Sequence, residues 1–380
     1  MLTAETFHPS DLPQTDIATW RALCASRPEF GNPLMGPDFA LAVGKVRGDA
    51  RVTVWRWPGR TAGFLAYHRR PGSYARPIGA PLSDYHGLVA EQGLDADEAL
   101  AAAGLSVYRF TGLTDPNQAF NGFGACERES FVIELETTAE AYLEALRAAS
   151  PKRFKNYRRL DHKLDREVGE LTIRGADRDQ AAFETLLRWK REQLARTGAH
   201  DFLSPVWTRD LLQALFERQH GEFQGLMVNL YAGDRLVAGH FGIRQGGVYH
   251  PWIASTDPEL AAWSPGQVFL GRAIAAMTEM GLTTYDLGPG HEHYKRPYAL
   301  TTRTICEGVA TAANLGGRAA QMSEQAWSLA GAHGQGAVGK LRRRLDIIAS
   351  TELSLAGRAR GVVQALGSRA RRQSAEMEVA

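Results

Sequence analysis

Cysteine is scarce in this sequence, and the few cysteines are scattered. Among 380 residues only Cys24, Cys126 and Cys306 occur, an odd number at spacings that fit neither a disulfide framework nor a zinc site. We therefore exclude a disulfide-stapled secreted scaffold and expect no bound metal. A reducing cytoplasm is the compartment that fits best.

A strong excess of charge of one sign is also missing. The 44 basic and 42 acidic residues leave a formal net charge of only +2. This balance argues against a protein built throughout to coat nucleic acid, so we expect no DNA partner. Any function that needs positive charge must be local.

Long apolar runs are absent as well. No stretch approaches the roughly 18 consecutive apolar residues that a membrane-spanning helix requires. The first 16 residues are polar and acidic, without the basic-then-apolar order of a signal peptide. We expect a cytoplasmic protein whose only membrane contact is peripheral, at the inner face.

What is present indicates a folded chain of more than one domain. Hydrophobic residues make up 44% and charged residues 23%, which is typical of soluble globular proteins. Domains cluster at roughly 100–150 residues, so 380 residues predict two units and an extension. We place the boundaries at residues 1–136, 137–315 and 316–380, because beyond about Leu315 the aromatic content nearly vanishes.

For the first unit the sequence predicts helices followed by strands. Helices are predicted between Ile17 and Gly44, and a hairpin around the turn Pro58-Gly59-Arg60. The remaining predicted elements are strands at 51–56, 63–67, 88–90, 106–110 and 130–135, with a helix at 95–103.

The second unit opens with two helices and continues with a meander. Ser150 is predicted to cap a helix in which Pro151 takes the first position. Gly233-Asp234 and Gly246-Gly247 are hairpin turns. The predicted helices are 138–149, 150–168, 181–196, 205–220 and 266–280, and the predicted strands are 170–174, 225–232, 235–244, 247–254 and 283–287. Strands that alternate with helices predict an α/β fold with a mixed sheet.

Several short motifs together resemble one family. They are Tyr249 with the residues up to Ser255, Ser264-Pro265-Gly266-Gln267, Tyr285-Asp286-Leu287-Gly288-Pro289-Gly290, Tyr294-Lys295, and the early loop Gly79-Ala80-Pro81-Leu82-Ser83-Asp84. Their arrangement over roughly residues 15–310 resembles Fem-like and CelD-type acyltransferases of the Gcn5-related N-acetyltransferase (GNAT) superfamily. The resemblance implies two tandem GNAT-like domains with a cleft between them.

The resemblance also implies an acyl thioester donor, acyl-CoA or acetyl-CoA. A helix that begins after a glycine-containing loop offers free amides and partial positive charge to a pyrophosphate. Ser264, Gly266 and Gln267 form such an entry and are the predicted cofactor-binding residues. An ordinary capped helix is the alternative.

Amine acylation needs one group to take a proton from the amine and another to protonate the departing thiolate. Asp286 is the candidate base or amine-orienting carboxylate, and Tyr294 is the candidate acid. His240, in a predicted strand, is a further candidate base. Asp286 can equally cap the glycine turn that follows it, and His240 can equally be a satisfied core residue.

The acceptor site is predicted from residues in both units. Lys295 is expected to neutralise a phosphate of a lipid- or nucleotide-linked amino sugar, and Asp84 and Tyr85 to help hold the sugar. Tyr249 and Arg159 complete the predicted substrate contacts. Arg159 belongs to a helix over 150–168 with seven basic and three acidic residues, a cationic face for diphosphate or anionic lipid.

The extension is basic and has more than one explanation. Arg342 to Arg344 and Arg369 to Arg372 could bind cyclic di-GMP, an anionic membrane or an anionic polysaccharide, or the segment could merely solubilise the chain. The resulting hypothesis is an N-acyltransferase acting on an exopolysaccharide precursor of holdfast type, regulated by cyclic di-GMP. The alternatives are a Fem-like ligase that uses aminoacyl-tRNA and an inactive nucleotide-responsive binding protein.

Overall fold

The computed structural model describes residues 1–290, 292–334 and 336–363, and the chain divides into two compact units. Unit 1 combines Met1–Arg128 and Gln193–Leu211 with the chain from Ile305 onward, whereas unit 2 combines Glu129–Glu192 with Leu212–Thr304. The strands β7 (Gly124–Glu134) and β13 (Thr301–Thr311) each begin in one unit and end in the other. Each unit is therefore assembled from segments far apart in the sequence.

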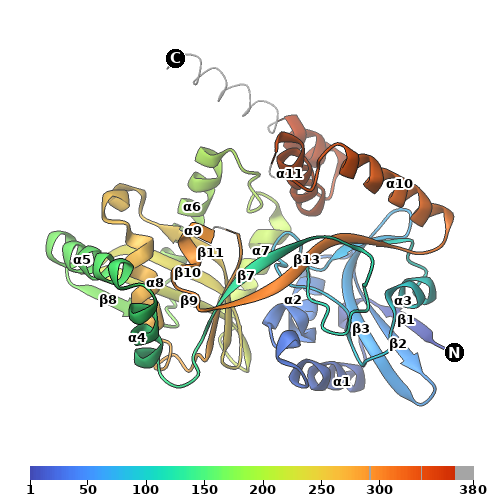
Figure 1. The fold of residues 1–380 in the computed structure, drawn as a ribbon, viewed down its shortest axis with the longest axis horizontal. Helices are drawn as coiled ribbons and strands as arrows, with labels where there is room; N and C mark the ends of the chain where they lie inside the picture. The colour runs from blue at the N-terminus through green and yellow to red at the C-terminus, as the bar shows by residue number, and fades with distance from the viewer. Residues whose placement is uncertain (291, 335, 364–380) are drawn as a thin grey trace. The chain divides into compact units, whose positions relative to one another are not determined.

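Unit 1 is built on a mixed sheet (Figure 1). Its strands are β1 (Thr3–Phe7), β2 (Ala50–Trp57), β3 (Arg60–Arg70), β4 (Tyr74–Pro77), β5 (Val89–Ala90), β6 (Val107–Leu113) and the end of β13. The strands β1 to β4 pair antiparallel in chain order, and β6 lies parallel to β4 after helix α3 (Ala96–Ala102). Helices α1 (Gln14–Ala25) and α2 (Pro37–Val46) precede β2, and Trp55, Tyr67 and Tyr108 are fully buried in the core.

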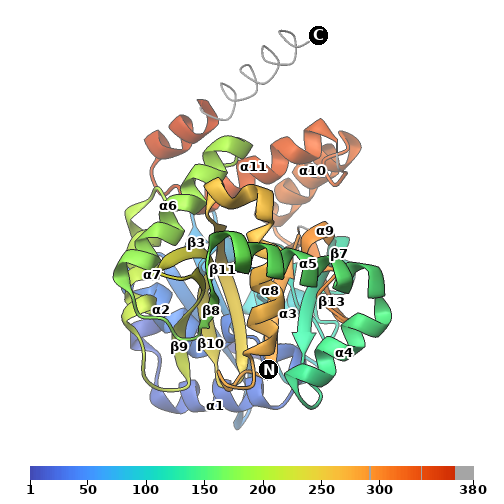
Figure 2. The same cartoon turned by 90° about the vertical axis from the view of Figure 1, so that its left-hand side faces the viewer.

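Unit 2 contains the other strands of the mixed sheet and several helices. The strands are the end of β7, β8 (Leu171–Arg174), β9 (Phe223–Ala232), β10 (Arg235–Gln245), β11 (Val248–Thr256) and β12 (Thr284–Pro289). The helices are α4 (Ala139–Ala149), α5 (Pro151–Val168), α8 (Pro265–Ala275) and α9 (Glu292–Lys295). Helices α6 (Gln180–Thr197) and α7 (Val206–Glu217) each have one end in unit 2 and the other in unit 1. Helices α4, α5 and α8 pack against one another beside this sheet (Figure 2).

The two units repeat one topological plan. In unit 2 the strands β8 to β11 pair antiparallel in chain order, β12 lies parallel to β11 after helix α8, and β7 closes the sheet antiparallel to β12. In unit 1 the strands β1 to β4, helix α3, and then β6 and β13 follow the same order. This repetition confirms the predicted fold class, a mixed α/β structure with two tandem GNAT-like units.

Local chemistry explains many of the element boundaries. Gly233 and Gly246 adopt positive φ angles of 58° and 54° in the turns that join β9 to β10 and β10 to β11. Glycine adopts this left-handed conformation without steric cost, so both predicted hairpins are confirmed. Pro151 takes the first position of α5 as predicted, but the Ser150 side chain makes no capping hydrogen bond.

The structure also differs from the sequence prediction. Helix α8 ends at Ala275 rather than at Met280, because the chain turns there before the left-handed Gly281. The strands β1, β4 and β13 were not predicted. The extension contains two helices, α10 (Leu315–Leu329) and α11 (Ala337–Thr351), followed by a further helical stretch up to residue 363.

Candidate active site

The parallel strands of unit 2 separate soon after they meet. Only Val248 with Thr284 and Tyr249 with Tyr285 pair between β11 and β12, although both strands continue beyond this point. The next residues, His250 and Asp286, therefore stand where the sheet opens. A break of this kind in a parallel pair leaves backbone and side chains that can face a ligand.

Asp286 lies inside the fold at this opening. Its carboxylate is fully buried, and Oδ1 accepts a hydrogen bond of 3.0 Å from the Gly288 amide. Asp286 Oδ1 lies 3.7 Å from His250 Nδ1, and Oδ2 lies 3.7 Å from a guanidinium nitrogen of Arg303. These contacts agree with the capping alternative, in which Asp286 holds the turn that follows β12.

Lys295 closes the same turn from the other side. Its ammonium donates hydrogen bonds to the carbonyl oxygens of Leu287, Gly288 and Pro289 at 2.5, 3.2 and 2.8 Å. Gly288 and Gly290 adopt left-handed φ angles of 73° and 74°, which lets successive carbonyls point toward one cation. Lys295 therefore fixes the conformation of the segment that connects β12 to α9.

Two tyrosines from the α9 region bind the first turn of α8. The Tyr294 hydroxyl donates to the Gly266 carbonyl at 3.0 Å, and the Tyr298 hydroxyl donates to the Gln267 carbonyl at 2.9 Å. Burial raises the pKa of both phenols well above the usual range. Both hydroxyls therefore keep their protons at neutral pH and act as hydrogen-bond donors.

The start of α8 has an unusual entry. Ser264 precedes the helix in the left-handed region, with φ 51° and ψ 53°, and its side chain makes no capping hydrogen bond. A Cβ atom added to Gly266 would lie 3.3 Å from the Tyr294 hydroxyl oxygen. The predicted residues Ser264, Gly266 and Gln267 thus stand together at one helix terminus, next to Tyr294.

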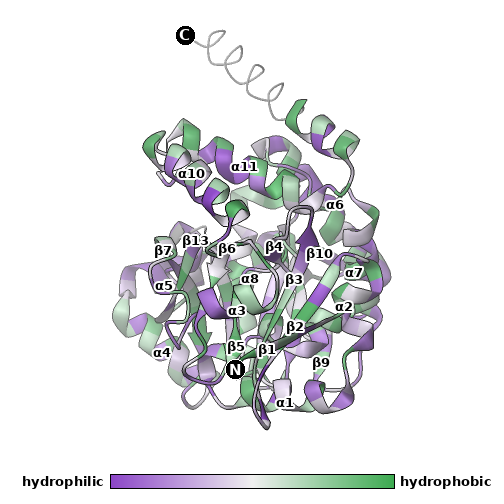
Figure 3. Ribbon diagram, turned by 90° about the vertical axis from the view of Figure 1, so that its right-hand side faces the viewer, coloured by the Kyte–Doolittle hydropathy of each residue, from purple (hydrophilic) through white to green (hydrophobic). Residues whose placement is uncertain are grey.

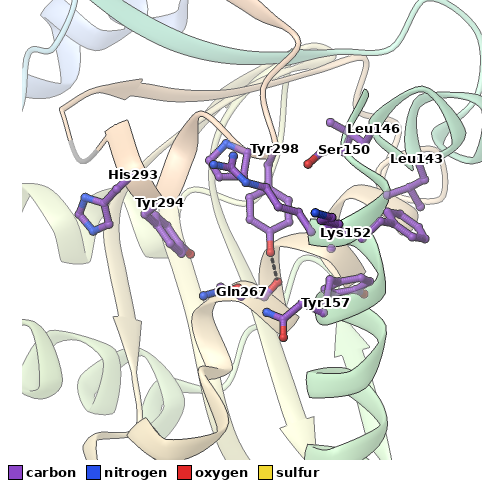
Figure 4. A pocket seen from close by; sticks show the side chains of 14 residues that line it. Leu143, Leu146, Ser150, Lys152, Tyr157, Gln267, His293, Tyr294 and Tyr298 are labelled. Carbon is purple, nitrogen blue, oxygen red and sulfur yellow. Dashed lines mark hydrogen bonds between the residues drawn. The ribbon is translucent and has the colours of Figure 1, made fainter. Parts of the chain in front are cut away.

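A pocket of about 490 Å³ lies within unit 2 beside these residues (Figure 4). Helices α4, α5, α8 and α9 and the turn after α9 supply its walls. The lining residues are Leu143, Leu146, Ser150, Lys152, Arg153, Phe154, Asn156, Tyr157, Gln267, Gly271, His293, Tyr294, Pro297 and Tyr298. A volume of this size suits a small-molecule ligand.

The pocket combines aromatic walls with a basic edge. Phe154, Tyr157, Tyr294 and Tyr298 are aromatic, whereas Lys152 and Arg153 are exposed cations in the first turn of α5. A Cβ atom on Gly271 would lie only 2.3 Å from the Tyr157 ring, so this glycine lets the ring pack directly on α8. Such a mixture suits a ligand that has both an apolar part and an anionic group.

Two of the three acidic residues of α5 contact the rest of the protein. Asp161 accepts two hydrogen bonds from Arg272 of α8, at 2.7 and 2.8 Å, and Asp165 accepts from the Leu171 amide at 3.0 Å. Lys152, Arg153 and Lys155 are exposed on the other side. Inward carboxylates leave the outer face of α5 cationic.

The other predicted site residues lie elsewhere. Tyr249 is fully buried and donates to the Leu226 carbonyl at 3.1 Å, and the exposed Arg159 donates to the Asn156 side chain. Asp84 and Tyr85 belong to unit 1, where Tyr85 is buried. Of the predicted residues, only Gln267 and Tyr294 line the pocket in the described part of the chain.

His240 is a buried core histidine. Its Nδ1 lies 2.8 Å from the Tyr285 hydroxyl oxygen, and its ring packs on Phe269 with centroids 4.4 Å apart. Burial is the main cause that lowers the pKa of His240 to about 3, with Lys295 and Lys190 contributing. An imidazole with so low a pKa is a poor acceptor for the proton of an ammonium substrate.

Because its pKa is lowered in the folded protein, His240 should make the free energy of unfolding fall at acid pH. Its pKa rises to about 6.5 on unfolding, so the unfolded chain binds the additional proton and stability falls as the pH drops from about 6.5 toward 3. Between pH 7 and 5 this group alone should cost about 2 kcal/mol. Urea unfolding of His240→Asn should show a correspondingly shallower pH dependence than the wild type. Equal slopes for both proteins would contradict this assignment.

Sequence reasoning missed most of the pocket. Phe154 and Tyr157 stand three residues apart on α5, so they occupy one helical face. That spacing was a usable signal. Because the sequence around Phe154 and Tyr157 is densely charged, it predicted a cationic face and not the wall of a pocket.

Two further properties concern metals and membranes. Across residues 1–290, 292–334 and 336–363, no group of three or more His, Cys, Asp and Glu side chains could hold a metal ion. In the same described ranges, no helix is both long enough and apolar enough to cross a bilayer.

Comparison with known proteins defines the class. Residues 151–296 match the acetyltransferase (GNAT) domain family. This segment contains α5, the strands β8 to β12, α8 and Tyr294, which are the parts that form the opened sheet and most of the pocket. The chain therefore contains an acyltransferase domain of GNAT type.

Several solved structures are similar to this chain at low sequence identity. FemX is 14% identical, with a TM-score of 0.51, over 80% of this chain and 96% of that one. L-PGS from Bacillus licheniformis is 16% identical over 80% and 94%, with a TM-score of 0.47. A tandem GNAT protein from the clavulanic acid biosynthesis pathway is 12% identical over 83% and 99%, with a TM-score of 0.44. The search of curated proteins found no match.

Proposed function

We propose that this enzyme transfers an acyl group from acyl-CoA to the amine of an amino sugar in an exopolysaccharide precursor, with the sugar linked to a lipid or a nucleotide. The pocket is the observation that carries this proposal. It joins the first turn of α8, two protonated tyrosines and a pair of exposed cations within one unit. The GNAT match covers the same elements.

The pocket residues fit the donor and the acceptor in chemical terms. A pyrophosphate is an anion that lysine and arginine bind, and Lys152 and Arg153 supply such groups here. The aromatic side chains Phe154 and Tyr157 offer flat apolar surface to a sugar ring or a base. In this proposal the cations hold the phosphates, and α8 orients the thioester.

The reaction follows direct attack. The amine nitrogen attacks the thioester carbonyl carbon, the carbon–nitrogen bond forms, and the carbon–sulfur bond breaks. In this proposal His293, which lines the pocket, takes the proton that the amine loses. Tyr294 donates its hydroxyl proton to the departing thiolate and regains one from water. Asp286 and Lys295 act as positioning groups that fix the turn before α9.

The cellular setting follows from the acceptor. A lipid-linked sugar places the enzyme in the cytoplasm, at the inner face of the membrane. The three cysteines support a reducing compartment, since all are free thiols. The holdfast-type polymer and the acyl chain length belong to this proposal as well.

The cyclic di-GMP site stays a prediction and has fewer candidate residues than the sequence suggested. Arg342 is 3% exposed, pairs with Glu324 and lies over the Trp327 ring, 5.6 Å from its centroid. Arg343 donates to the Gly334 carbonyl at 3.2 Å. Arg369, Arg371 and Arg372 lie outside the described residues.

A thiol-release assay tests the proposed function. Purified protein is mixed with acetyl-CoA and either a UDP-linked or a lipid-linked amino sugar, and free thiol is followed with time. We expect thiol release that depends on the free amine, together with a product heavier by one acyl group. Transfer from aminoacyl-tRNA and none from acyl-CoA would contradict the proposal. In cells, loss of the gene should remove the N-acyl mass increment from surface polysaccharide.

A further inference from the structure

Exposed apolar side chains are concentrated in the extension, which we define as residues 315–363. Among the described residues, eleven large hydrophobic side chains are exposed, and eight of them belong to this short segment. These eight are Leu315, Met322, Leu329, Leu341, Ile347, Leu353, Leu355 and Val363. Figure 3 shows hydrophobic and hydrophilic stretches alternating along α10 and α11. A concentration of this kind marks an interaction surface.

Three of these side chains form a line on α10. Leu315, Met322 and Leu329 are seven residues apart and are 85%, 71% and 90% exposed. Seven residues complete almost two helical turns, so the three side chains project in nearly the same direction. The exposed Ala319 and Ala326 continue the line between them. Helix α10 therefore carries an apolar stripe that no described residue covers.

The opposite side of the extension is anchored to unit 1 through its acidic residues. Arg109 of β6 donates to Glu324 of α10 at 2.8 Å and to Asp346 of α11 at 2.5 Å. Glu352 lies 3.4 Å from His200 Nε2. Glu324, Asp346 and Glu352 are the only acidic residues of the extension in the sequence. Arg109 thus neutralises Glu324 and Asp346, whereas Glu352 faces His200, whose pKa is lowered by burial.

The charges that remain outside are positive. Arg318, Lys340 and Arg360 are exposed and make no ion pair with another described residue. In the sequence, Arg369, Arg371 and Arg372 follow, and then Glu376 and Glu378. The extension therefore carries both an apolar stripe and exposed cations, and one of these, Arg318, stands beside the stripe between Leu315 and Met322.

We propose that the extension docks on the surface of an anionic lipid bilayer. The α10 stripe enters the headgroup boundary, and the exposed cations pair with lipid phosphates, as in helices that lie in a membrane interface. A second copy of the chain fits less well, since it would bring cations against cations. Helix α5 is also cationic, but it carries no exposed large hydrophobic side chain. This inference does not depend on the acyl-transfer proposal.

Vesicle flotation tests the apolar stripe. The full-length protein is mixed with phosphatidylcholine vesicles, either pure or containing phosphatidylglycerol. We expect flotation with the anionic vesicles, weakening at high salt, and little with the neutral ones. Met322→Glu combined with Leu329→Glu should lower vesicle partitioning about tenfold or more. The matched control is Val206→Glu, since Val206 is 62% exposed outside the extension, and it should bind as the wild type does.

Charge-reversal variants test whether the extension or α5 binds the anionic vesicles. Lys340→Glu with Arg360→Glu should weaken anionic binding, whereas Arg158→Glu on α5 should not. Circular dichroism and thermal melting check that each variant is folded, and Met322→Ser with Leu329→Ser serves as a milder pair. The proposal is overturned if the wild type does not float, if the stripe variants float like the wild type, or if only Arg158→Glu abolishes binding. It is also overturned if sedimentation shows a wild-type dimer that the stripe variants dissociate and that has no vesicle affinity.

Discussion

Tyr294→Phe should lower kcat/KM for acyl transfer by about 10²–10⁴-fold, the usual range for removing a group that transfers a proton in the transition state. The phenylalanine ring keeps the packing of Tyr294 but removes the hydroxyl that donates to the Gly266 carbonyl. Substrate binding should change little, so the loss should appear in kcat. Steady-state kinetics with acetyl-CoA and the amino-sugar acceptor measure it.

Tyr298 provides a matched control for this experiment. Its hydroxyl donates to the neighbouring Gln267 carbonyl at 2.9 Å, and its ring lines the same pocket. Tyr298→Phe removes a similar hydrogen bond from a buried phenol. Its loss of kcat/KM therefore shows how much of the loss in Tyr294→Phe comes from changed structure. We expect a loss of less than about tenfold. Equal losses in the two variants would assign Tyr294 a purely structural role.

The pH profile gives an independent check on Tyr294. Burial raises the pKa of its hydroxyl well above the usual value for tyrosine. The group therefore remains protonated, and able to donate, across the whole pH range in which the protein is folded. Activity should show no alkaline decline assignable to Tyr294 below about pH 10. A decline near pH 9 that disappears in Tyr294→Phe would contradict this view.

Local signals made much of the fold predictable. The hairpins of unit 2 follow from glycine turns that need positive φ, and Pro151 marks the start of α5. The strand β13 was missed because its partner β6 lies almost 200 residues earlier and its side chains alternate weakly between buried and exposed. Pairing between segments so far apart leaves no signal in the local sequence, because the backbone amides and carbonyls of the two strands find their hydrogen-bond partners only in the folded unit.

The candidate site was predictable only in part, for a related reason. Tyr294 and Gln267 stood out because they lie close to glycine-containing turns. Tyr157 reaches the pocket because Gly271, more than 100 residues away, leaves room for its ring. Whether Asp286 faces a ligand or the interior depends on how β12 sits between β11 and β7. A single sequence does not contain that information.

Replacing Asp286 tests whether its carboxylate only holds the turn after β12 or also takes part in catalysis. Asp286→Ala should lower the free energy of unfolding by about 2–4 kcal/mol, because the Gly288 amide loses its acceptor and the buried His250 and Arg303 lose a nearby carboxylate. Asp286→Asn keeps an oxygen that can accept from Gly288 and should cost only about 1 kcal/mol. Urea unfolding measures both, with Asp210→Ala on the exposed face of α7 as a control near zero.

The activity of Asp286→Asn then decides the role of the carboxylate. A general base loses its function when it becomes an amide, whereas a positioning group that accepts one hydrogen bond largely keeps it. Because Asp286 is fully buried and bound to Gly288, we expect Asp286→Asn to retain activity within about tenfold of the wild type. If this variant folds normally and yet loses more than about a thousandfold, Asp286 is the base, and the sheet must open further during turnover to admit the amine.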